Sequence, residues 1–329
     1  MADRFAIGLY SGGLDSTLAL NLVQRLGFKV VAVHFTTPFT VNLYGKKKKK
    51  LKKNGFIFKK LFLGKEYIEL LKNPKYGYGK NFNPCVDCHI MMIKKAKSLM
   101  EEYGADFVFT GEVLGERPMS QRKDTLRIVE RESGLEGRLL RPLSAKLLSE
   151  TIPEKEGIID RNKLFAIKGR SRKEQFKLAE EMGIMDFPHP AGGCPLTEEN
   201  IAKRVEESLK HNEDTIFDMI LLRLGRHLRL PGGEKLVSGR NEEENNLLLR
   251  LTRNKGIKLS VKDYSSTYLY LRDANDEDTI KEAGRVCARY SSVKNKESVE
   301  VYYWNKDIEK RKIIKVKPYS EEEVENLLI

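Results

Sequence analysis

Two glycines, an aspartate and three hydroxyl side chains stand together near the start of the chain, in the stretch SGGLDST at residues 11–17. Backbone N–H groups at the beginning of a helix are unpaired, and glycines let an anion approach them closely. The helix dipole adds partial positive charge at that end. The stretch has neither the G-K-[ST] ending of a Walker A loop nor the G-x-G-x-x-G spacing of a dinucleotide turn. It therefore predicts a binding site of another type for a phosphate-bearing ligand.

Cysteine spacing marks a second candidate site. Cys85 and Cys88 form a C-x-x-C pair, and Cys194 lies far from them in the sequence. Three thiols of this kind suit a [4Fe–4S] cluster in which one iron has no protein ligand. The competing hypothesis makes Cys85 or Cys88 a persulfide carrier and Cys194 its resolving partner, with no metal. We favour the cluster.

Zinc is the third hypothesis for these cysteines, and it would require four ligands. His89 and His189 are the histidines that would complete such a set. Cys287 lies in a separate helical stretch, and we expect it to pack among apolar side chains. In a reducing compartment, metal binding or catalysis is favoured over disulfides for the four cysteines.

The elements around these residues predict a doubly wound parallel α/β sheet. Residues 5–10 and 29–35 are short apolar runs typical of buried strands, with an amphipathic helix between them. Such a strand–helix–strand unit crosses over right-handedly into a parallel sheet. A helix at about 90–103, a strand at 106–112 and a strand-like segment at 137–145 continue the alternation.

Ligands of such sheets bind beyond the carboxyl ends of the strands. We therefore expect three stretches to converge on one pocket: the glycine pair at 11–17, the end of the second strand at 34–36, and residues 111–121.

The rest of the chain predicts a second, smaller α+β domain. We place the first domain at 1–205 and the second at 206–329. Two alternating runs at 298–319 predict a β-hairpin in the second domain. Within the first domain, nine lysines between residues 46 and 60 mark an insertion at about 45–65. We expect this insertion to be solvated and mobile when free, and able to hold RNA phosphates.

Net charge indicates a polyanionic partner. The formal charge is +13 and the sequence pI is near 9.3, a balance typical of nucleic-acid binding. A lysine-rich or thermophilic proteome is the alternative explanation. No apolar run approaches the roughly 20 residues of a membrane span, and no secretory signal begins the chain. We therefore expect a cytoplasmic protein with no membrane partner.

The stretch SGGLDST resembles the phosphate loop of the PP-loop ATP pyrophosphatases. These enzymes bind the pyrophosphate end of ATP and transfer AMP to a substrate oxygen. The resemblance implies that Asp15 acts through Mg²⁺ or by orienting the loop. It also implies that the ATP phosphates are held by Ser11, Gly12, Gly13, Ser16 and Thr17.

Further stretches are similar to tRNA thiolases of this superfamily. FTGEVLGERPMSQ at 109–121 and LLRPLSA at 139–145 resemble ThiI-type 4-thiouridine synthases. NPCVDCH at 83–89 resembles MnmA-like 2-thiouridylases, and HPAGGCPLT at 189–197 lies downstream of it, as a thiolase would require. Several tRNA thiolases have a comparable set of three cysteines, whose open iron is thought to carry the sulfide.

The resemblance implies an AMP- and pyrophosphate-forming tRNA sulfurtransferase. ATP would adenylate a uridine carbonyl oxygen, and sulfur from free sulfide or an external donor would then displace AMP. We favour 4-thiouridine over 2-thiouridine as the product. The implied catalytic residues are Asp15, Cys85 and Cys194, and the implied metal ligands are Cys85, Cys88 and Cys194. The implied ATP-binding residues are Ser11, Gly12, Gly13, Asp15, Ser16, Thr17, His34, Phe35, Gly111 and Gln121.

The C-terminal part resembles the NFACT-R module, a small domain linked to RNA binding. The similar stretches are LVSGRNEEENNLLLRL at 236–251, AGRVCARYSSVKNKESVEVYYW at 283–304 and KIIKVKP at 312–318. Because no RNA-binding module precedes the phosphate loop, we expect this domain and the lysine-rich insertion to bind the tRNA.

Two other functions stay open. One is a non-catalytic RNA-binding protein with a relic PP-loop domain, which the intact SGGLDST and the three cysteines disfavour. The other is an amide-forming PP-loop ligase with cysteine-bound zinc, which the cysteine spacing and the missing glutaminase domain disfavour. The oligomeric state is open, and a homodimer is one expectation.

Overall fold

The structure is a computed structural model that describes residues 4–45, 55–185, 193–274 and 276–329. The chain divides into two compact units. The N-terminal unit comprises Met1–Val41 and Lys47–Glu199, and the C-terminal unit comprises Asn42–Lys46 and Asn200–Ile329.

The N-terminal unit is built on a five-stranded parallel sheet in the order β3-β2-β1-β4-β5. This arrangement confirms the predicted doubly wound fold. Because β2 and β4 flank β1, the strand order reverses at the carboxyl end of β1, where ligands of such sheets bind. The strands are β1 (Phe5–Leu9), β2 (Lys29–Thr36), β3 (Ile57–Phe62), β4 (Phe107–Phe109) and β5 (Leu139–Leu140).

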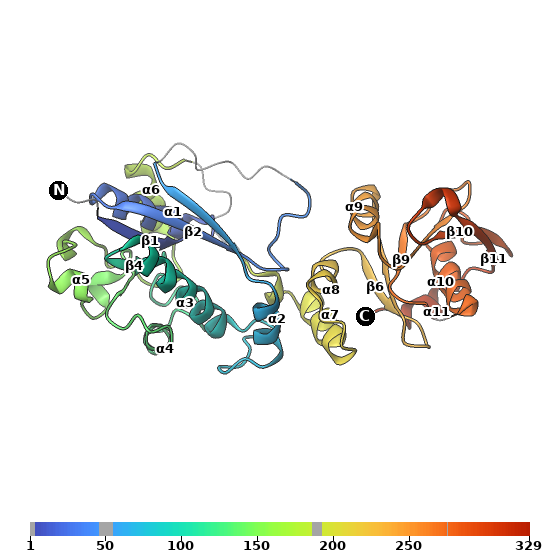
Figure 1. Ribbon diagram of the computed structural model, residues 1–329, viewed down its shortest axis with the longest axis horizontal. Helices are drawn as coiled ribbons and strands as arrows, with labels where there is room; N and C mark the ends of the chain where they lie inside the picture. The colour runs from blue at the N-terminus through green and yellow to red at the C-terminus, as the bar shows by residue number, and fades with distance from the viewer. Residues whose placement is uncertain (1–3, 46–54, 186–192, 275) are drawn as a thin grey trace. The chain divides into compact units, whose positions relative to one another are not determined.

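Helices cover both faces of this sheet (Figure 1). On one face, α1 (Leu14–Arg25) packs beside α6 (Lys173–Glu181). On the other face, α3 (Cys85–Tyr103) packs beside α4 (Lys123–Glu132). Alternation along the strands divides the core, since Ala6, Val30 and Ala32 lie with α1 while Ile7, Val31 and Val33 lie with α3.

The predicted insertion at about 45–65 needs a correction. Residues Ile57–Phe62 form the edge strand β3, which pairs with β2 over six residue pairs, and α2 (Lys65–Lys72) follows it. The apolar residues around the last two lysines are good strand formers, and the lysine count obscured this signal. The seven lysines at 46–53 lie outside the described residues. The other two of the nine, Lys59 and Lys60, belong to this strand.

The helix expected at about 90–103 begins earlier, at Cys85. Pro84 is its N-cap residue and Gly104 ends it in the left-handed conformation, with φ 57°. This start places Cys85 and Cys88 in the first turn of α3.

The C-terminal unit has a six-stranded antiparallel sheet in the order β11-β10-β8-β9-β7-β6. Its strands are β6 (Arg226–Arg229), β7 (Lys235–Ser238), β8 (Ile257–Val261), β9 (Leu269–Leu271), β10 (Val299–Trp304) and β11 (Lys312–Val316). The pair β10–β11 is the predicted hairpin. Cys287 lies on α10 (Glu277–Arg289) with no exposed surface, so its predicted apolar packing is confirmed.

The remaining helices are short or flank the two sheets. In the part of the chain that the structure describes, none is long and apolar enough to cross a membrane. The remaining helices are α5 (Ile152–Lys155), α7 (Glu199–Lys210), α8 (Ile216–Leu221), α9 (Glu242–Thr252) and α11 (Glu321–Glu325).

Candidate functional site

The glycine-rich stretch forms the turn between β1 and α1. Gly12 has a φ of 90°, a left-handed conformation that favours glycine, and Gly13 is the N-cap residue of α1. The hydroxyl oxygens of Ser11 and Ser16 lie 3.1 Å apart, and Ser16 Oγ donates to Gly13 O at 3.0 Å. No side chain of the described residues caps α1. The turn therefore holds its shape through its own hydroxyls and leaves the positive end of the helix open to an anion.

Asp15 lies in the first turn of α1 with an unsatisfied carboxylate. Its Oδ1 is buried and has no hydrogen-bond partner among the described residues. Burial, and after it the nearby Glu116 carboxylate, raise the pKa of Asp15 to about 6 against the opposing charge of Arg172. Buried polar atoms without a partner are rare, and a carboxylate oxygen beside a phosphate site is a suitable Mg²⁺ ligand.

Gln175 of α6 lies beside Asp15 and has no exposed surface. Neither its amide nitrogen nor its amide oxygen has a hydrogen-bond partner among the described residues. The Gln175 amide lies close enough to lower the pKa of Asp15, so the two buried polar side chains face each other on the α6 side of the turn.

Gly111 brings the turn after β4 against the phosphate turn. A Cβ at this position would lie 2.5 Å from Ser16 N and 2.6 Å from Asp15 O, which are both backbone atoms. Real Cβ atoms do not approach backbone so closely, so the contact requires glycine. The structure thus joins Gly111 to the predicted phosphate site.

His34 and Phe35 are adjacent on β2 and therefore lie on opposite faces of the sheet. His34 Nδ1 donates to Tyr10 O at 2.9 Å, on the face of the phosphate turn and α1. Phe35 packs into the core on the α3 face. The two predicted ATP-binding residues are thus separated by the sheet, and an ATP contact by either of them stays a prediction.

Gln121 closes the loop that follows Gly111. Its side-chain oxygen accepts from Arg117 N at 3.1 Å, and its backbone oxygen accepts from Gly115 N at 2.8 Å. Within this loop, the buried Glu116 pairs with Arg172 at 2.5 Å. Gln121 shapes the loop that carries Glu116 towards Asp15, and its contact with ATP stays a prediction.

The structure gathers the three candidate cysteines around one buried tyrosine. Tyr67 of α2 is 2% exposed, and its pKa is raised well above the usual value by burial and by the neighbouring thiols of Cys88, Cys194 and Cys85. Burial, then the charges of Cys194 and Cys85, raises the pKa of Cys88 to about 12. Thiols from two distant segments of the chain therefore lie together, and burial disfavours the thiolate form of Cys88 and Cys194.

The donor atoms around the cysteines bear differently on the two metal hypotheses. No group of three or more His, Cys, Asp or Glu side chains among the described residues is placed to hold a single metal ion. His89 donates to Glu112 at 2.9 Å, and His189 lies outside the described residues. A cubane cluster is bound through separate irons, so its thiolates stand further apart than ligands of one zinc ion. The three thiols lie together around Tyr67, and a cluster bound to them stays a prediction.

Both sites lie at the same edge of the sheet. The end of α3 lies at the amino edge, where the backbone N–H of Asp106 donates to Phe5 O at 2.9 Å. Because α3 is about 28 Å long, its first turn with the cysteines reaches the carboxyl edge. Residues 111 and 112 connect the sites, since Gly111 abuts the phosphate turn and Glu112 accepts from His89 of α3.

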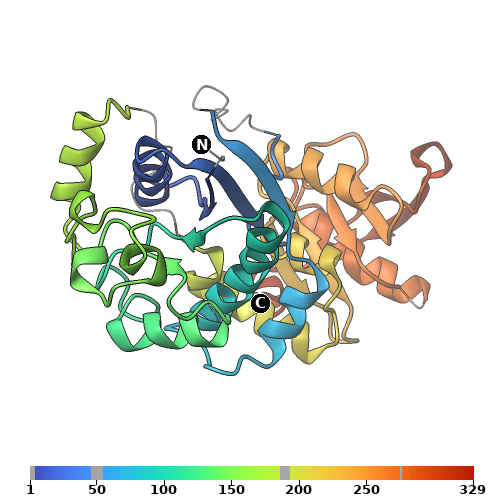
Figure 2. The same cartoon turned by 60° about the vertical axis from the view of Figure 1, so that its left-hand side comes forward.

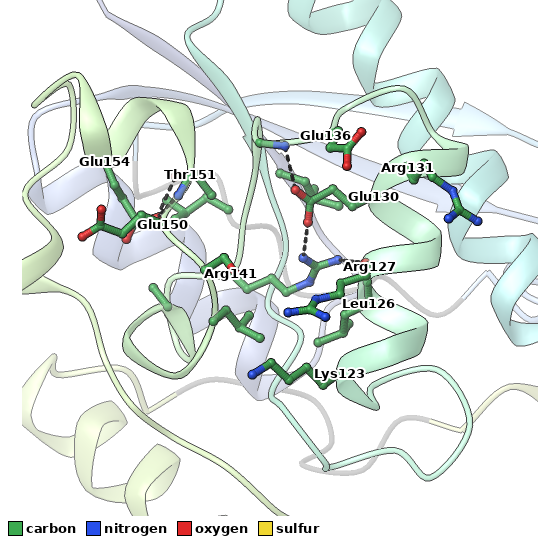
Figure 3. A pocket seen from close by; sticks show the side chains of 16 residues that line it. Lys123, Leu126, Arg127, Glu130, Arg131, Glu136, Arg141, Glu150, Thr151 and Glu154 are labelled. Carbon is green, nitrogen blue, oxygen red and sulfur yellow. Dashed lines mark hydrogen bonds and ion pairs between the residues drawn. The ribbon is translucent and has the colours of Figure 1, made fainter.

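Arg141, a partner of Glu112, lines a cavity between α4 and residues 136–154 (Figure 3). Arg141 is 3% exposed and donates to Glu112 Oε2 at 3.1 Å and to Glu130 Oε2 at 3.2 Å. Burial alone would raise the pKa of Glu112. The charge of Arg141 and the hydrogen bond from His89 instead hold this pKa at about 2. Arg141 therefore fixes the carboxylate that positions His89.

Several partners of the site come from distant segments and could not be predicted from the sequence. Tyr67, Arg172 and Gln175 carry no local motif, and only the fold brings them to the turn or to the cysteines. Tyr10 was detectable because it directly precedes Ser11, and its hydroxyl lies 3.7 Å from the position of a Cβ at Gly12.

Comparison with known protein families matches two segments of the chain. Residues 2–159 match the family described as thiamine biosynthesis protein (ThiI). Residues 225–328 match the family described as NFACT protein RNA binding domain.

Two curated relatives match part of the chain. A probable tRNA sulfurtransferase of Thermococcus kodakarensis is 34% identical over 141 residues, which are 42% of this chain and 36% of that protein. The tRNA-specific 2-thiouridylase MnmA of Petrotoga mobilis is 31% identical over 136 residues, 35% of this chain and 36% of that protein. The chain thus spans about a third of the length of each of these relatives.

Solved structures with local similarity include a 4-thiouridine synthetase in complex with RNA and bound ATP. The match has a TM-score of 0.39 and 18% identity, and covers 66% of this chain and 53% of the other. The U34-tRNA thiolase NcsA of Methanococcus maripaludis, with its [4Fe–4S] cluster, matches with a TM-score of 0.33 and 15% identity over 68% of this chain and 74% of the other. The family matches confirm both resemblances stated from the sequence. Residues 2–159 are therefore similar to the ThiI family of PP-loop proteins, and residues 225–328 are similar to the NFACT RNA-binding domains.

Proposed function

We propose that the chain is an ATP-dependent tRNA sulfurtransferase that replaces a uridine carbonyl oxygen with sulfur, with 4-thiouridine favoured over 2-thiouridine. The observation that carries this proposal is the connection of two sites by residues 111 and 112. Gly111 abuts the phosphate turn, and Glu112 holds His89 beside the cysteines. The names of the curated relatives support the same chemistry.

Activation of the base would take place at the phosphate turn. The uridine oxygen attacks the α-phosphorus of ATP, a new P–O bond forms, and pyrophosphate leaves. The backbone N–H groups at Gly12 and Gly13 and the start of α1 would bind the departing pyrophosphate. The unpartnered Oδ1 of Asp15 would hold the Mg²⁺ that accompanies ATP.

Replacement of the oxygen would take place at the cysteines. Sulfide, free or from an external donor, bonds to the activated carbon, and AMP leaves with the former carbonyl oxygen. Cys85, Cys88 and Cys194 would bind a [4Fe–4S] cluster, which supplies an open iron to hold sulfur. Tyr67 and the Asn83 amide, which donates to Cys85 Sγ at 3.1 Å, orient these thiols.

The RNA would be bound by the positive charge of the chain. The C-terminal unit carries the match to the NFACT RNA-binding family, and the formal net charge is +13. Binding to tRNA phosphates would be salt-dependent because it releases counterions. A cytoplasmic location suits a tRNA substrate and oxygen-sensitive cysteines.

The test uses the full chain purified without oxygen. Iron, acid-labile sulfide and zinc are measured with the visible spectrum, for the wild type, Cys194→Ala and the control Cys287→Ala. The control removes a buried thiol of the C-terminal unit. We expect about four irons and four sulfides per chain in the wild type and the control, and loss of both in Cys194→Ala.

The same proteins are then given an unmodified tRNA transcript, Mg²⁺–ATP and sulfide. Formation of thiouridine, with one AMP and one pyrophosphate per sulfur, would support the function, and mass spectrometry of the nucleosides identifies the product. Tight RNA binding without AMP formation would instead support the relic PP-loop domain. Zinc without iron would contradict the cluster. Metal-free thiolation that requires a persulfide donor in place of sulfide would support a persulfide relay between Cys85 or Cys88 and Cys194.

A further inference from the structure

The free edge of the parallel sheet carries exposed aromatic side chains. Phe58 and Phe62 of β3 are 49% and 45% exposed, and β3 pairs only with β2 within the described sheet (Figure 2). The register pairs Phe58 with Ala32, Lys60 with His34 and Phe62 with Thr36. Because register partners share a face, Phe58, Lys60 and Phe62 lie on the face of α1. We call these three residues the β3 platform.

No helix packing accounts for the exposure of the β3 platform in the described part of the chain. Helix α1 contacts β1 and β2, and no helix in the described part of the chain makes a comparable contact with β3. Edge strands are usually blunted by charge or covered, because exposed apolar edges promote association. Two exposed phenylalanines on one such strand mark an interaction surface.

The β3 platform is continuous with the phosphate turn. The ring of Phe58 lies 6.3 Å from that of His34 in a stacked arrangement at 25°, and 5.8 Å from that of Tyr10, edge on at 75°. Tyr10 directly precedes Ser11 of the turn. A ligand on the platform would therefore extend towards the site of adenylation.

We propose that the β3 platform stacks the unpaired bases of a single-stranded RNA segment. Aromatic rings interleaved with a cation on a strand surface are the usual means of binding unstacked bases and the adjoining phosphates. Phe58 and Phe62 are roughly 13 Å apart along the strand, so they would contact different bases, with Lys60 between them for a phosphate. Charge complementarity favours RNA over a protein partner, since the sequence just before β3 holds seven further lysines.

This inference rests on the proposed RNA substrate and makes it more specific: the tRNA would present an unpaired segment beside the target uridine. A duplex region would not stack on the β3 platform, because its bases are already stacked on each other. Ile57 and Lys59 lie on the opposite face of the same strand, where Lys59 pairs with Glu102.

The first experiment measures the affinity of the full chain for a fluorescein-labelled single-stranded 12-nucleotide oligouridylate by anisotropy. The variants are Phe58→Ala, Phe62→Ala, their combination, and the control Ile57→Ala, which removes an exposed apolar side chain from the opposite face. Each phenylalanine variant should weaken binding by about fivefold to a hundredfold, and the control should not. Phe58→Tyr should restore most of the affinity, because it keeps the ring.

Salt dependence separates stacking from charge. Lys60→Gln should lower the slope of log affinity against log salt by about 0.7, whereas the phenylalanine variants should keep the slope of the wild type. Wild-type affinity in the combined phenylalanine variant would overturn the proposal. So would a loss of ATP affinity with RNA affinity unchanged, or a dimer that dissociates in this variant without loss of RNA binding.

Failure of the platform and failure of the proposed function give different results. Thiouridine formation by the wild type, with equal oligouridylate affinity in all variants, overturns the platform alone. Phenylalanine-dependent binding by a chain that forms no thiouridine supports the platform and contradicts the sulfurtransferase.

Discussion

His89 Nδ1 lies 2.9 Å from Glu112 Oε1, and this hydrogen bond connects the N-terminal part of α3, next to Cys88, to the turn after β4. The other oxygen of the same carboxylate accepts from Thr110 at 2.9 Å and from Arg141 at 3.1 Å. Glu112 is therefore the residue through which both halves of the site are held in one geometry. Carboxylate–histidine pairs of this kind fix the orientation and tautomer of the ring.

The first prediction concerns Glu112→Gln. The substitution keeps the shape of the side chain but leaves the buried Arg141 with Glu130 as its remaining carboxylate partner. We expect the free energy of unfolding to fall by about 3 kcal/mol, because removing one partner leaves a buried charge undercompensated. Guanidinium unfolding followed by far-ultraviolet circular dichroism measures the change.

The pH dependence of this effect has a defined sign. The folded pKa of Glu112, about 2, lies below the value of roughly 4.3 for a free glutamate. Its contribution is therefore complete above that value and is lost as the pH falls towards 2. The control Glu66→Gln removes a half-exposed pair with Lys95 and should change stability little. Equal losses in both variants would contradict the anchoring role of Glu112.

The second prediction concerns Gly111→Ala. The added methyl would meet backbone atoms of Ser16 and Asp15 at 2.5 and 2.6 Å, so the phosphate turn or the turn after β4 must move. We expect ATP affinity to fall at least tenfold with little change in secondary structure, because the N–H groups of the turn lose their alignment. Isothermal titration with ATP and Mg²⁺ measures the affinity.

A glycine without close neighbours provides the control. A Cβ at Gly193 would meet nothing within 4 Å, and Gly193 does not have positive φ. Gly193→Ala should bind ATP as the wild type does. Normal ATP affinity in Gly111→Ala would remove the turn after β4 from the phosphate site.

The sequence predicted the parts of the site whose function requires a local pattern. The phosphate turn was evident because Gly12, Gly13 and the hydroxyls must follow one strand and begin one helix. The C-x-x-C pair was evident for the same reason, although the start of its helix was placed about five residues too late. Pro84 lies just before that helix and is compatible with its start, but the apolar period that we followed begins only at Ile90.

The sequence did not predict the parts that only the tertiary structure assembles. Gln175 and Arg172 reach Asp15 from a helix more than 150 residues away, and no spacing announces that contact. Tyr67 lies among the thiols because α2 follows the edge strand, and that strand was hidden in a lysine-rich stretch. Local propensity identifies elements, but which distant side chains share a pocket depends on their packing.

The third prediction concerns the charge network of the C-terminal unit. Glu207 of α7 accepts from Arg229 Nε at 2.7 Å and pairs with Lys235, which is 4% exposed. Glu207→Gln should destabilise this unit by about 2–3 kcal/mol, since both cations then depend on Glu213. Trp304, the only tryptophan, lies in this unit and reports its unfolding by fluorescence.

The adjacent residue on the same helix gives a matched control. Glu206 pairs with Lys210 at 2.9 Å, and both side chains are more than half exposed. Glu206→Gln should leave the fluorescence transition nearly unchanged. An effect as large as that of Glu207→Gln would mean that helix propensity, not the buried network, determines the stability of α7.

The fourth prediction concerns His227, which lies on β6 and is 1% exposed. Burial lowers its pKa well below 6.5, and the charges of Arg204 and Lys235 lower it further. Its Nε2 donates to Leu224 O at 2.9 Å, whereas its Nδ1 is buried without a partner among the described residues. Below about pH 6.5 the unfolded chain binds a proton that the folded chain does not, so stability falls as the pH falls.

The loss should approach about 1.4 kcal/mol per pH unit between pH 6 and 5 in urea titrations followed by Trp304 fluorescence. His227→Leu should remove this slope, and an unchanged slope in that variant would assign the pH dependence to the neighbouring carboxylates instead.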